Sequence, residues 1–359
     1  MRNCEAMIAK ANSAGVKLRP HVKTHKTLEI GRMQMRESCV GIMASTLPEV
    51  RLFAHNGFKD VTYGVPVSRS KLKPLHDIAS SSGAQINVMI DNAQQLEWVS
   101  ETWNTGGAKH THVLGAFLKI DSGYHRAGVD VHKDRTAAIA LARQLHTSEA
   151  VRFLGVYSHS GHAYNARTKE EAVKLSDAEC AAAAAFAKDL KATGIPCDVI
   201  SVGSTPSCAA AASFPGVTEI HPGNYVFFDR QQSATGACSE ADIAATVLTR
   251  VIGHYDDHFL CDAGSLAMSK DSAPQDGGFG TVLGSPNLLL AAVSQECGKI
   301  TVHDTVGKKR RRPDEAALPL GSLLRILPNH SCLTAACHPL FFVLRGDQVV
   351  DVWRPCRGF

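Results

Sequence analysis

The chain has 359 residues, of which 44% are hydrophobic and 20% charged, and its formal net charge is +4 with the 17 histidines counted as neutral. This is the composition of a globular enzyme, and a mild charge without a long basic face argues against nucleic acid as the main partner. The 11 cysteines have no regular spacing and form no CxxC pair, which excludes a small disulfide-rich secreted domain. Since no segment resembles a signal peptide or a membrane span, we expect a cytoplasmic protein with no membrane partner.

Eight short segments rich in apolar and β-branched residues recur along the first two thirds of the chain. Helical patterns separate them, and one begins with a capping box of Thr46 and Glu49 and ends at Gly57. An alanine-rich helix over 168–192 is followed by the stop signals Gly194 and Pro196. The predicted strands are 16–22, 39–45, 60–66, 85–90, 115–121, 152–160, 197–203 and 217–223.

This alternation predicts an α/β fold with a parallel sheet and helices outside it. Eight such units in roughly 230 residues predict a (β/α)8 TIM-like barrel. A doubly wound open sheet is the alternative, although no GxGxxG motif follows the first predicted strand. After about residue 235 the segments become strand-like with few helices, so we expect a barrel domain over 1–234 and a β-rich C-terminal domain over 235–359.

Barrels of this kind carry their chemistry at the carboxyl ends of the strands. The first end reads RPHVKTHK, from Arg19 to Lys26. Strand alternation places His21 and Lys23 on one face with Val22 opposite, whereas Lys26 falls in the start of the helix. Lys23 is therefore the better candidate for an inward amine whose pKa burial and neighbouring cations would lower. A solvated cluster of cations on a loop is the alternative, and the octapeptide alone does not decide.

The fifth and sixth strand ends add polar groups. In LKIDSGYHRAG, Lys119 and Asp121 share a face, and Arg126 either pairs with Asp121 or points inward to bind a phenolate or a carboxylate. In YSHSGHAY, Tyr157 and His159 share a face. The imidazole is either a satisfied core histidine or a group that stacks on a planar ring.

The seventh and eighth ends read GSTPS (203–207) and HPGNY (221–225). Glycine followed by Ser and Thr offers backbone N–H groups and hydroxyls that can hold a phosphate, and barrels often bind phosphate after strands seven and eight. Two ordinary turns are the alternative, because Gly, Pro, Asn and Ser are turn residues.

A last pair lies in the second domain, in PNHSC (328–332). His330 and Cys332 lie on one face if the segment is extended, and imidazole with thiolate is a half-site for zinc. Two ligands suit a catalytic zinc completed by water and substrate. A buried cysteine beside a turn histidine is the alternative, because short H-x-C matches arise by chance.

Taken together, these segments resemble the alanine-racemase-like (fold-type III) pyridoxal phosphate enzymes, and within them the group of D-serine dehydratases and D-threonine aldolases. The resemblance covers nearly the whole chain and rests on LRPHVKTHKT, LKIDSGYHRAGV, VGSTPSC, EIHPGNYVFFD and PNHSCLTAACHP. It implies conversion of D-serine to pyruvate and ammonia with pyridoxal 5'-phosphate and Zn2+. It also implies a homodimer.

The resemblance assigns roles to individual residues. It implies that Lys23 forms the Schiff base with the cofactor and takes the Cα proton, and that His159 stacks on the pyridine ring. The zinc ligands would be His330 and Cys332, whose thiol favours a dehydratase over an aldolase. Residues that would line the cofactor or hold its phosphate are Tyr157, Tyr164, Gly203, Ser204, Thr205, Gly223, Asn224 and Tyr225, with Arg126 beside them.

Three positions qualify the resemblance. Relatives carry an N-terminal strand before the Arg2–Asn3 pair, so we expect that strand to be missing here. Cys297 stands where relatives commonly show histidine, and His221 stands where racemases place an arginine near the ring nitrogen. The alternative functions are D-threonine aldolase, 3-hydroxyaspartate dehydratase, and a catalytically impaired relative that only binds the cofactor.

Overall fold

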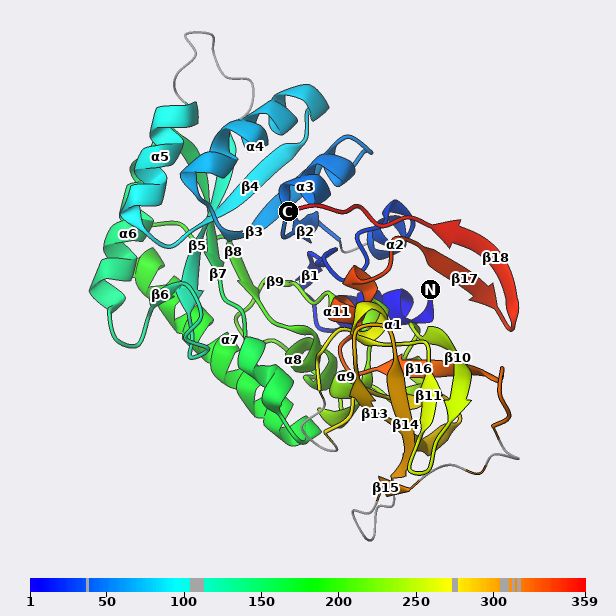
Figure 1. The fold of residues 1–359 in the computed structure, drawn as a ribbon. Coiled ribbons are helices and arrows are strands. Elements are labelled where there is room, and N and C mark those ends of the chain that lie inside the picture. The colour runs from blue at the N-terminus through cyan, green and yellow to red at the C-terminus, as the bar shows by residue number, and fades with distance from the viewer. Residues whose placement is uncertain (37–38, 104–112, 273–276, 304–309, 312–313, 315–317) are drawn as a thin grey trace. The chain divides into compact units, whose positions relative to one another are not determined.

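A computed structural model describes the chain except residues 37–38, 104–112, 273–276, 304–309, 312–313 and 315–317. The chain forms two compact units (Figure 1). The first contains Met1–Tyr225 together with Trp353–Phe359, and the second contains Val226–Val352. The domain boundary at 234 and 235 stays a prediction from the sequence.

The first unit is built on eight parallel strands in the order β1-β9-β8-β7-β5-β4-β3-β2. Parallel bridges from Leu18 to Cys39 and from His21 to Met43 join the two ends of this order, so the sheet closes on itself. The predicted TIM-like barrel and its eight strands are therefore confirmed. The strands are β1 (Lys17–Leu18), β2 (Ile42–Ala44), β3 (Asp60–Pro66), β4 (Gln85–Ile90), β5 (Leu114–Asp121), β7 (Val151–Tyr157), β8 (Val199–Val202) and β9 (Glu219–Ile220).

Helices follow the strands on the outside of the barrel (Figure 1). Thr46 caps α3 by accepting a hydrogen bond from the Glu49 N–H, while the Glu49 carboxylate accepts from the backbone N–H of Ser45. Asp134 caps α6, which follows the short strand β6 (Val129–Asp130). The helices are α1 (Arg2–Ser13), α2 (Leu28–Gln34), α3 (Leu47–Ala54), α4 (Arg69–Ser82), α5 (Ala93–Trp103), α6 (Arg135–Thr147), α7 (Lys169–Ala192) and α8 (Thr205–Ala210).

A mostly buried polar layer lies near the amino ends of β3 and β9, whose first residues are Asp60 and Glu219. Arg19, just after β1, lies 3.0 Å from the Glu219 carboxylate and also pairs with Asp60. Thr62 accepts a hydrogen bond from the same guanidinium at 3.2 Å, and Asn87 donates to both Asp60 and Thr62. Because every charge in this layer has a partner, it can stay buried within the barrel.

The second unit is rich in β-strands, as predicted, and these strands pair antiparallel. Its seven-stranded sheet has the order β11-β10-β16-β12-β13-β14-β15, and β11 also pairs with β14. Val251, Phe259, Leu290, Ile300 and Ile326 belong to its buried core. Its strands are β10 (Val247–His254), β11 (Phe259–Cys261), β12 (Gly280–Val282), β13 (Ser285–Val293), β14 (Gly298–His303), β15 (Arg310–Arg311), β16 (Leu323–Pro328), β17 (Phe341–Arg345) and β18 (Gln348–Trp353), the last two forming a separate hairpin.

The second unit also contains three short helices: α9 (Arg230–Ala234), which precedes β10, and α10 (Ser265–Met268) and α11 (Ser331–Ala336), which lie between strands. Across the described part of both units, no helix is at once long and apolar enough to cross a bilayer.

Candidate active site

A cavity opens at the carboxyl ends of the barrel strands. Four of the predicted site residues line it, namely Lys23, Arg126, Tyr157 and His159. The other lining residues are His21, Ser45, Gly64, Val65, Pro66, Lys119 and Ala127. The structure thus brings together side chains that follow β1, β5 and β7 in the sequence, which is where a barrel places its chemistry.

The two lysines of the first strand end have different surroundings. After His21 the chain turns, and the N–H groups of His25 and Lys26 both bond to the Val22 carbonyl. The Lys26 ammonium lies 2.9 Å from the carboxylate of the fully buried Glu49. Lys23 instead lines the cavity, and its backbone N–H donates to His21 Nδ1 at 3.2 Å. Lys23 therefore lies at the candidate site, whereas Lys26 forms an ion pair with Glu49.

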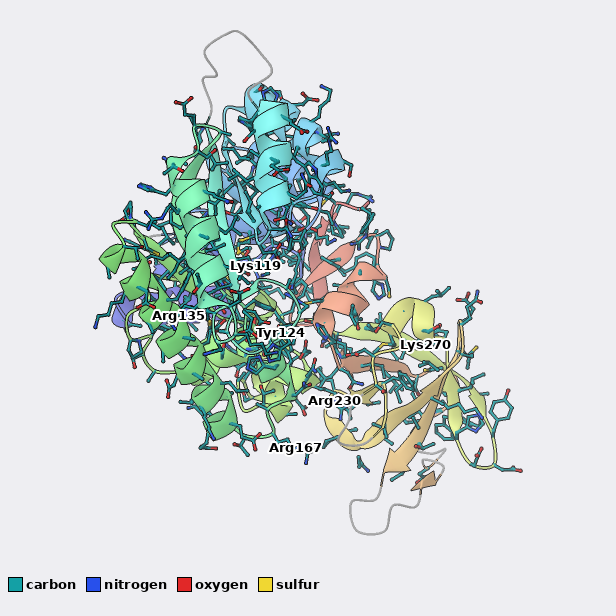
Figure 2. All side chains as sticks on the ribbon, turned by 90° about the vertical axis from the view of Figure 1, so that its left-hand side faces the viewer. Lys119, Tyr124, Arg135, Arg167, Arg230 and Lys270 are labelled. Carbon is teal, nitrogen blue, oxygen red and sulfur yellow. The ribbon has the colours of Figure 1, made fainter. Side chains whose placement is uncertain are left out.

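Lys119 is a second amine in the cavity, and sequence reasoning gave it no role. Its ammonium lies 4.6 Å from the centre of the Tyr157 ring, and only 3% of the residue is exposed. Burial, helped by the Arg126 charge, lowers the pKa of Lys119 to about 8. The sequence offered one signal for this position: Lys119 shares a face with Asp121 on β5, and every residue of that strand is buried. Lys119 and Tyr124, labelled in Figure 2, come from β5 and from the loop after it.

Arg126 and Asp121 have separate partners. Asp121 Oδ1 accepts from the backbone N–H groups of Gly123, Tyr124 and His125 at 2.8, 2.9 and 3.1 Å, and Oδ2 lies 3.1 Å from His125 Nδ1. The Arg126 guanidinium lies 5.0 Å from the centre of the Tyr124 ring. Of the two alternatives for Arg126, the structure favours the inward one, because Asp121 shapes the loop and Arg126 reaches the cavity.

Two histidines and a tyrosine form a cluster of rings at the cavity. Tyr157 and His221 stack with ring centres 4.2 Å apart, and the Tyr157 hydroxyl lies 3.3 Å from His221 Nδ1. Since the Ser158 carbonyl can only accept, the 2.8 Å contact with His221 Nε2 places the proton on Nε2. Nδ1 therefore accepts from Tyr157. Burial lowers the pKa of His221 to about 3, so this ring is neutral.

His159 is held by the turn that follows β8. Its Nδ1 donates to the Gly203 carbonyl at 2.8 Å. Burial, followed by the neighbouring Lys23 charge, lowers the pKa of His159 well below the ordinary value. The ring is therefore a neutral, fixed surface on the cavity wall.

The two turns predicted to hold a phosphate lie side by side. The Gly223 N–H donates to Thr205 Oγ1 at 3.2 Å, and Ser204 caps α8. Gly203 has φ +122°, and a Cβ there would lie 2.3 Å from Cys208 Sγ. A Cβ on Gly223 would lie 2.8 Å from the His21 Cβ, so both glycines allow a close approach that other residues would block.

The remaining predicted cofactor residues lie near these turns. Asn224 and Tyr225 form the 3-10 helix η2 (Asn224–Val226) directly after Gly223, and both side chains are buried. Tyr164 lies in the 3-10 helix η1 (Gly161–Asn165), beyond the residues that line the cavity.

The candidate metal pair lies in the second unit. His330 is the N-cap of α11, and Cys332 is in its first turn. Burial opposes the charged imidazole, yet the hydrogen bond and charge of Cys332 raise the pKa of His330 to about 9. His330 Nδ1 lies 3.6 Å from Asp271 Oδ2. No cluster of three or more His, Cys, Asp or Glu side chains that could hold a metal occurs within the described ranges.

Cys297 lies in the turn between β13 and β14, where its carbonyl accepts from the Ser294 N–H.

Two family descriptions match the chain. The description "Alanine racemase, N-terminal domain" matches residues 1–231, and "Putative serine dehydratase domain" matches residues 244–344. The first match alone covers more than half of the chain, and the two follow the division into a barrel and a β-rich unit.

Relatives match along the whole length. A D-serine dehydratase from Dictyostelium discoideum is 36% identical, with 98% of this chain and 93% of the relative covered. A D-threo-3-hydroxyaspartate dehydratase from Delftia is 34% identical in its solved structure, with a TM-score of 0.91 and 100% and 95% of the two chains covered. A variant of that enzyme, with one cysteine replaced by alanine and in the metal-free form, gives 32% identity and a TM-score of 0.91 over the same shares.

Proposed function

We propose that this chain, which belongs to the alanine-racemase-like family of pyridoxal phosphate enzymes and within it to the D-serine dehydratase group, converts D-serine to pyruvate and ammonia. The observation that carries the proposal is the cavity at the barrel mouth, where Lys23 lies with Arg126, Tyr157 and His159. An amine, a guanidinium, a phenol and an imidazole suit this reaction, and they come from three separate strand ends.

The residues present suit pyridoxal phosphate. Three cations, Lys23, Lys119 and Arg126, line the cavity, and no described lining residue is a carboxylate, which favours an anionic occupant. The turns at Gly203 and Gly223 are joined by the hydrogen bond from the Gly223 N–H to the Thr205 hydroxyl, and they offer hydroxyl and glycine backbone groups of the kind that bind a phosphate. When bound, the cofactor withdraws electrons from the Cα of the attached amino acid.

The chain's own groups then have distinct tasks. Lys23 holds the cofactor covalently before substrate arrives and afterwards takes the Cα proton on its amine. His159 provides a flat, neutral ring, and Arg126 binds the phenolate oxygen or the substrate carboxylate. The phosphate is held by Gly203, Ser204, Thr205, Gly223 and Asn224. Tyr225 lies beside this group with its hydroxyl bonded to Gln34, and Tyr157 and Tyr164 lie beside the cofactor.

We further propose that His330 and Cys332 bind Zn2+. An imidazole and a thiol that already interact form a nitrogen and sulfur donor pair of the kind zinc prefers. A bound zinc ion would act as a Lewis acid on the substrate hydroxyl. The solved relative with a cysteine replaced by alanine in the metal-free form is in keeping with a thiol ligand.

The test is pyruvate release from D-serine, measured on protein in which bound cofactor and zinc are quantified in the same sample. We expect activity that chelation removes and zinc restores. A protein that is fully active without zinc would remove the role given to His330 and Cys332. Absence of pyruvate with both cofactors bound would contradict the D-serine reaction.

A second candidate is the dehydration of D-threo-3-hydroxyaspartate. The cation-rich cavity favours a substrate with an additional carboxylate, and the Delftia relative carries that name. Parallel assays with D-serine, D-threonine and D-threo-3-hydroxyaspartate separate the two dehydratases from an aldolase, since an aldolase releases an aldehyde and glycine instead. A relative that only binds the cofactor would give none of these products.

We also propose a cytoplasmic homodimer, from the resemblance to a group that is typically dimeric. Light scattering coupled to size-exclusion chromatography tests the oligomeric state, and a monomeric active enzyme would contradict it.

A further inference from the structure

A chain of buried hydrogen bonds runs through the barrel unit from His25 to Gln34 to Tyr225. All three residues are 0% exposed. His25 Nε2 lies 2.9 Å from Gln34 Oε1, and Gln34 Nε2 donates to the Tyr225 hydroxyl at 3.1 Å. Gln34 and Tyr225 are 191 positions apart in the sequence, so the chain of bonds joins distant segments of the barrel unit.

The direction of every hydrogen bond in this chain is fixed. The backbone N–H of Thr27 donates to His25 Nδ1 at 3.1 Å, so Nδ1 carries a lone pair and Nε2 carries the proton. His25 Nε2 then donates to Gln34 Oε1, which leaves the Gln34 amide nitrogen to donate to Tyr225. Burial lowers the pKa of His25 to about 4, so the neutral form persists through the physiological range.

The two ends of this chain of hydrogen bonds lie next to the two parts of the proposed cofactor site, the Lys23 turn and the Gly223 turn. His25 lies two residues after Lys23, in the turn that bonds to the Val22 carbonyl. Tyr225 lies two residues after Gly223, whose N–H bonds to Thr205. The His21 N–H donates to the Pro222 carbonyl at 3.0 Å, so the two turns also touch directly at their other side.

We propose that His25, Gln34 and Tyr225 are positioning residues that fix the Lys23 turn relative to the Gly223 turn. A cofactor held at one point by an amine and at another by its phosphate binds best when the distance between the two points is set in advance. The inference rests on the proposed role of Lys23. It adds that cofactor affinity depends on a link that touches neither the amine nor any substrate.

Two substitutions of His25 distinguish the effect of losing the bond to Gln34 from the effect of losing the bond from Thr27 within the Lys23 turn. In His25→Asn, the short side-chain oxygen takes the place of Nδ1 and keeps the Thr27 bond but cannot reach Gln34. In His25→Gln, the longer amide takes the place of Nε2 and keeps the Gln34 bond but gives up the Thr27 bond. We expect His25→Asn to raise the cofactor dissociation constant about tenfold, because it loses one buried hydrogen bond within the link to Gln34. We expect His25→Gln to stay within about threefold of the parent, because the Thr27 bond that it gives up lies outside that link.

The mildest variants remove the link without touching the Lys23 turn. Tyr225→Phe deletes one oxygen, and Gln34→Met keeps the side-chain length but has no donor. Each should weaken cofactor binding about as much as His25→Asn. The double variant Gln34→Met, Tyr225→Phe should bind like either single variant, because both break the same chain.

Three readouts are taken on each protein without substrate: the pyridoxal phosphate dissociation constant by titration, the pH dependence of the bound-cofactor absorbance band, and the melting temperature of the cofactor-free protein. If these residues have a positioning role, the variants bind the cofactor more weakly and the pH dependence of the bound-cofactor absorbance band shifts. Both changes are then larger than the fall in melting temperature of the cofactor-free protein accounts for. His25→Asn with unchanged affinity, His25→Gln as weak as His25→Asn, or additive single effects would each overturn the inference.

The measurement also separates this inference from the proposed function. If Lys23→Ala keeps the bound-cofactor band, the role of Lys23 fails and the positioning inference fails with it. If Lys23→Ala loses the band while the Gln34 and Tyr225 variants bind normally, only the positioning inference fails. A protein inert toward D-serine still reports on the link through cofactor affinity.

Discussion

Cations lie at both ends of the same barrel, but their surroundings differ. At the amino ends of the strands, Arg19 pairs with Glu219 at 3.0 Å and with Asp60. At the carboxyl ends, Lys119 and Arg126 line a cavity in which no described lining residue is a carboxylate. One end thus neutralises its charge within the fold, whereas the other leaves positive charge facing an open space.

This difference separates structure from function in physical terms. A buried charge needs a partner, so the Arg19 cluster stabilises the barrel only while it is complete. A cavity lined by cations has its partner supplied by a ligand, and an anionic cofactor and substrate meet that need. We therefore expect changes at the amino ends to affect unfolding and changes at the carboxyl ends to affect binding and catalysis.

The largest expected effect is at the mouth, from Lys23→Ala. Loss of the amine removes both the covalent attachment of the cofactor and the proton acceptor, so kcat should fall by on the order of 10³-fold or more. Lys23→Arg is the matched variant, since it keeps the positive charge but cannot form the covalent bond. Pyruvate release and the bound-cofactor absorbance are the measurements. Retention of both in Lys23→Ala would contradict the role of Lys23.

At the other end, Arg19→Met tests the paired layer. The substitution leaves the carboxylates of Glu219 and Asp60 without their cation, and Glu219 is 2% exposed. We expect the free energy of unfolding to fall by about 3–5 kcal/mol, measured by urea denaturation. Cofactor affinity in the folded fraction should change little. A loss below about 1 kcal/mol, or a loss of affinity without loss of stability, would break the contrast between the two ends.

Lys119, one of the cations at the carboxyl ends, makes the free energy of unfolding depend on pH. Its pKa is about 8 in the folded protein against an ordinary 10.5, so between these values the unfolded chain binds more protons and stability rises with pH. Below about pH 8 the buried ammonium costs about 3 kcal/mol, at 1.36 kcal/mol per pKa unit.

Lys119→Met removes this cost, so its stability relative to the parent should be greatest near pH 7 and decline toward pH 10.5. Urea unfolding of both proteins across this range measures the difference. Lys188, which is exposed on α7, is the matched position for the loss of one amine. A difference that stays constant with pH would show that Lys119 carries no displaced proton equilibrium.

The sequence predicted much of the barrel because its signals are local. Alternation and strand order placed Lys23, Arg126, Tyr157 and His159 at one end, and the structure brings all four to the same cavity. Lys119 was missed because alternation alone does not tell a cavity-facing side chain from one packed in the core. The link from His25 to Gln34 and Tyr225 was also missed. It joins residues 191 positions apart, which no local pattern reveals.

The smallest expected effect is from Thr62→Val, which keeps shape and strand propensity and removes one hydroxyl from the paired layer. Thr62 accepts from Arg19 at 3.2 Å and from Asn87 at 3.1 Å, yet both donors keep Asp60 as a partner. We therefore expect a loss of only about 1 kcal/mol in the free energy of unfolding. In the Arg19→Met background, the loss caused by Thr62→Val should be smaller, because one of the two donors to the Thr62 hydroxyl is already gone. Equal losses in both backgrounds would mean that the layer acts as separate bonds rather than as one network.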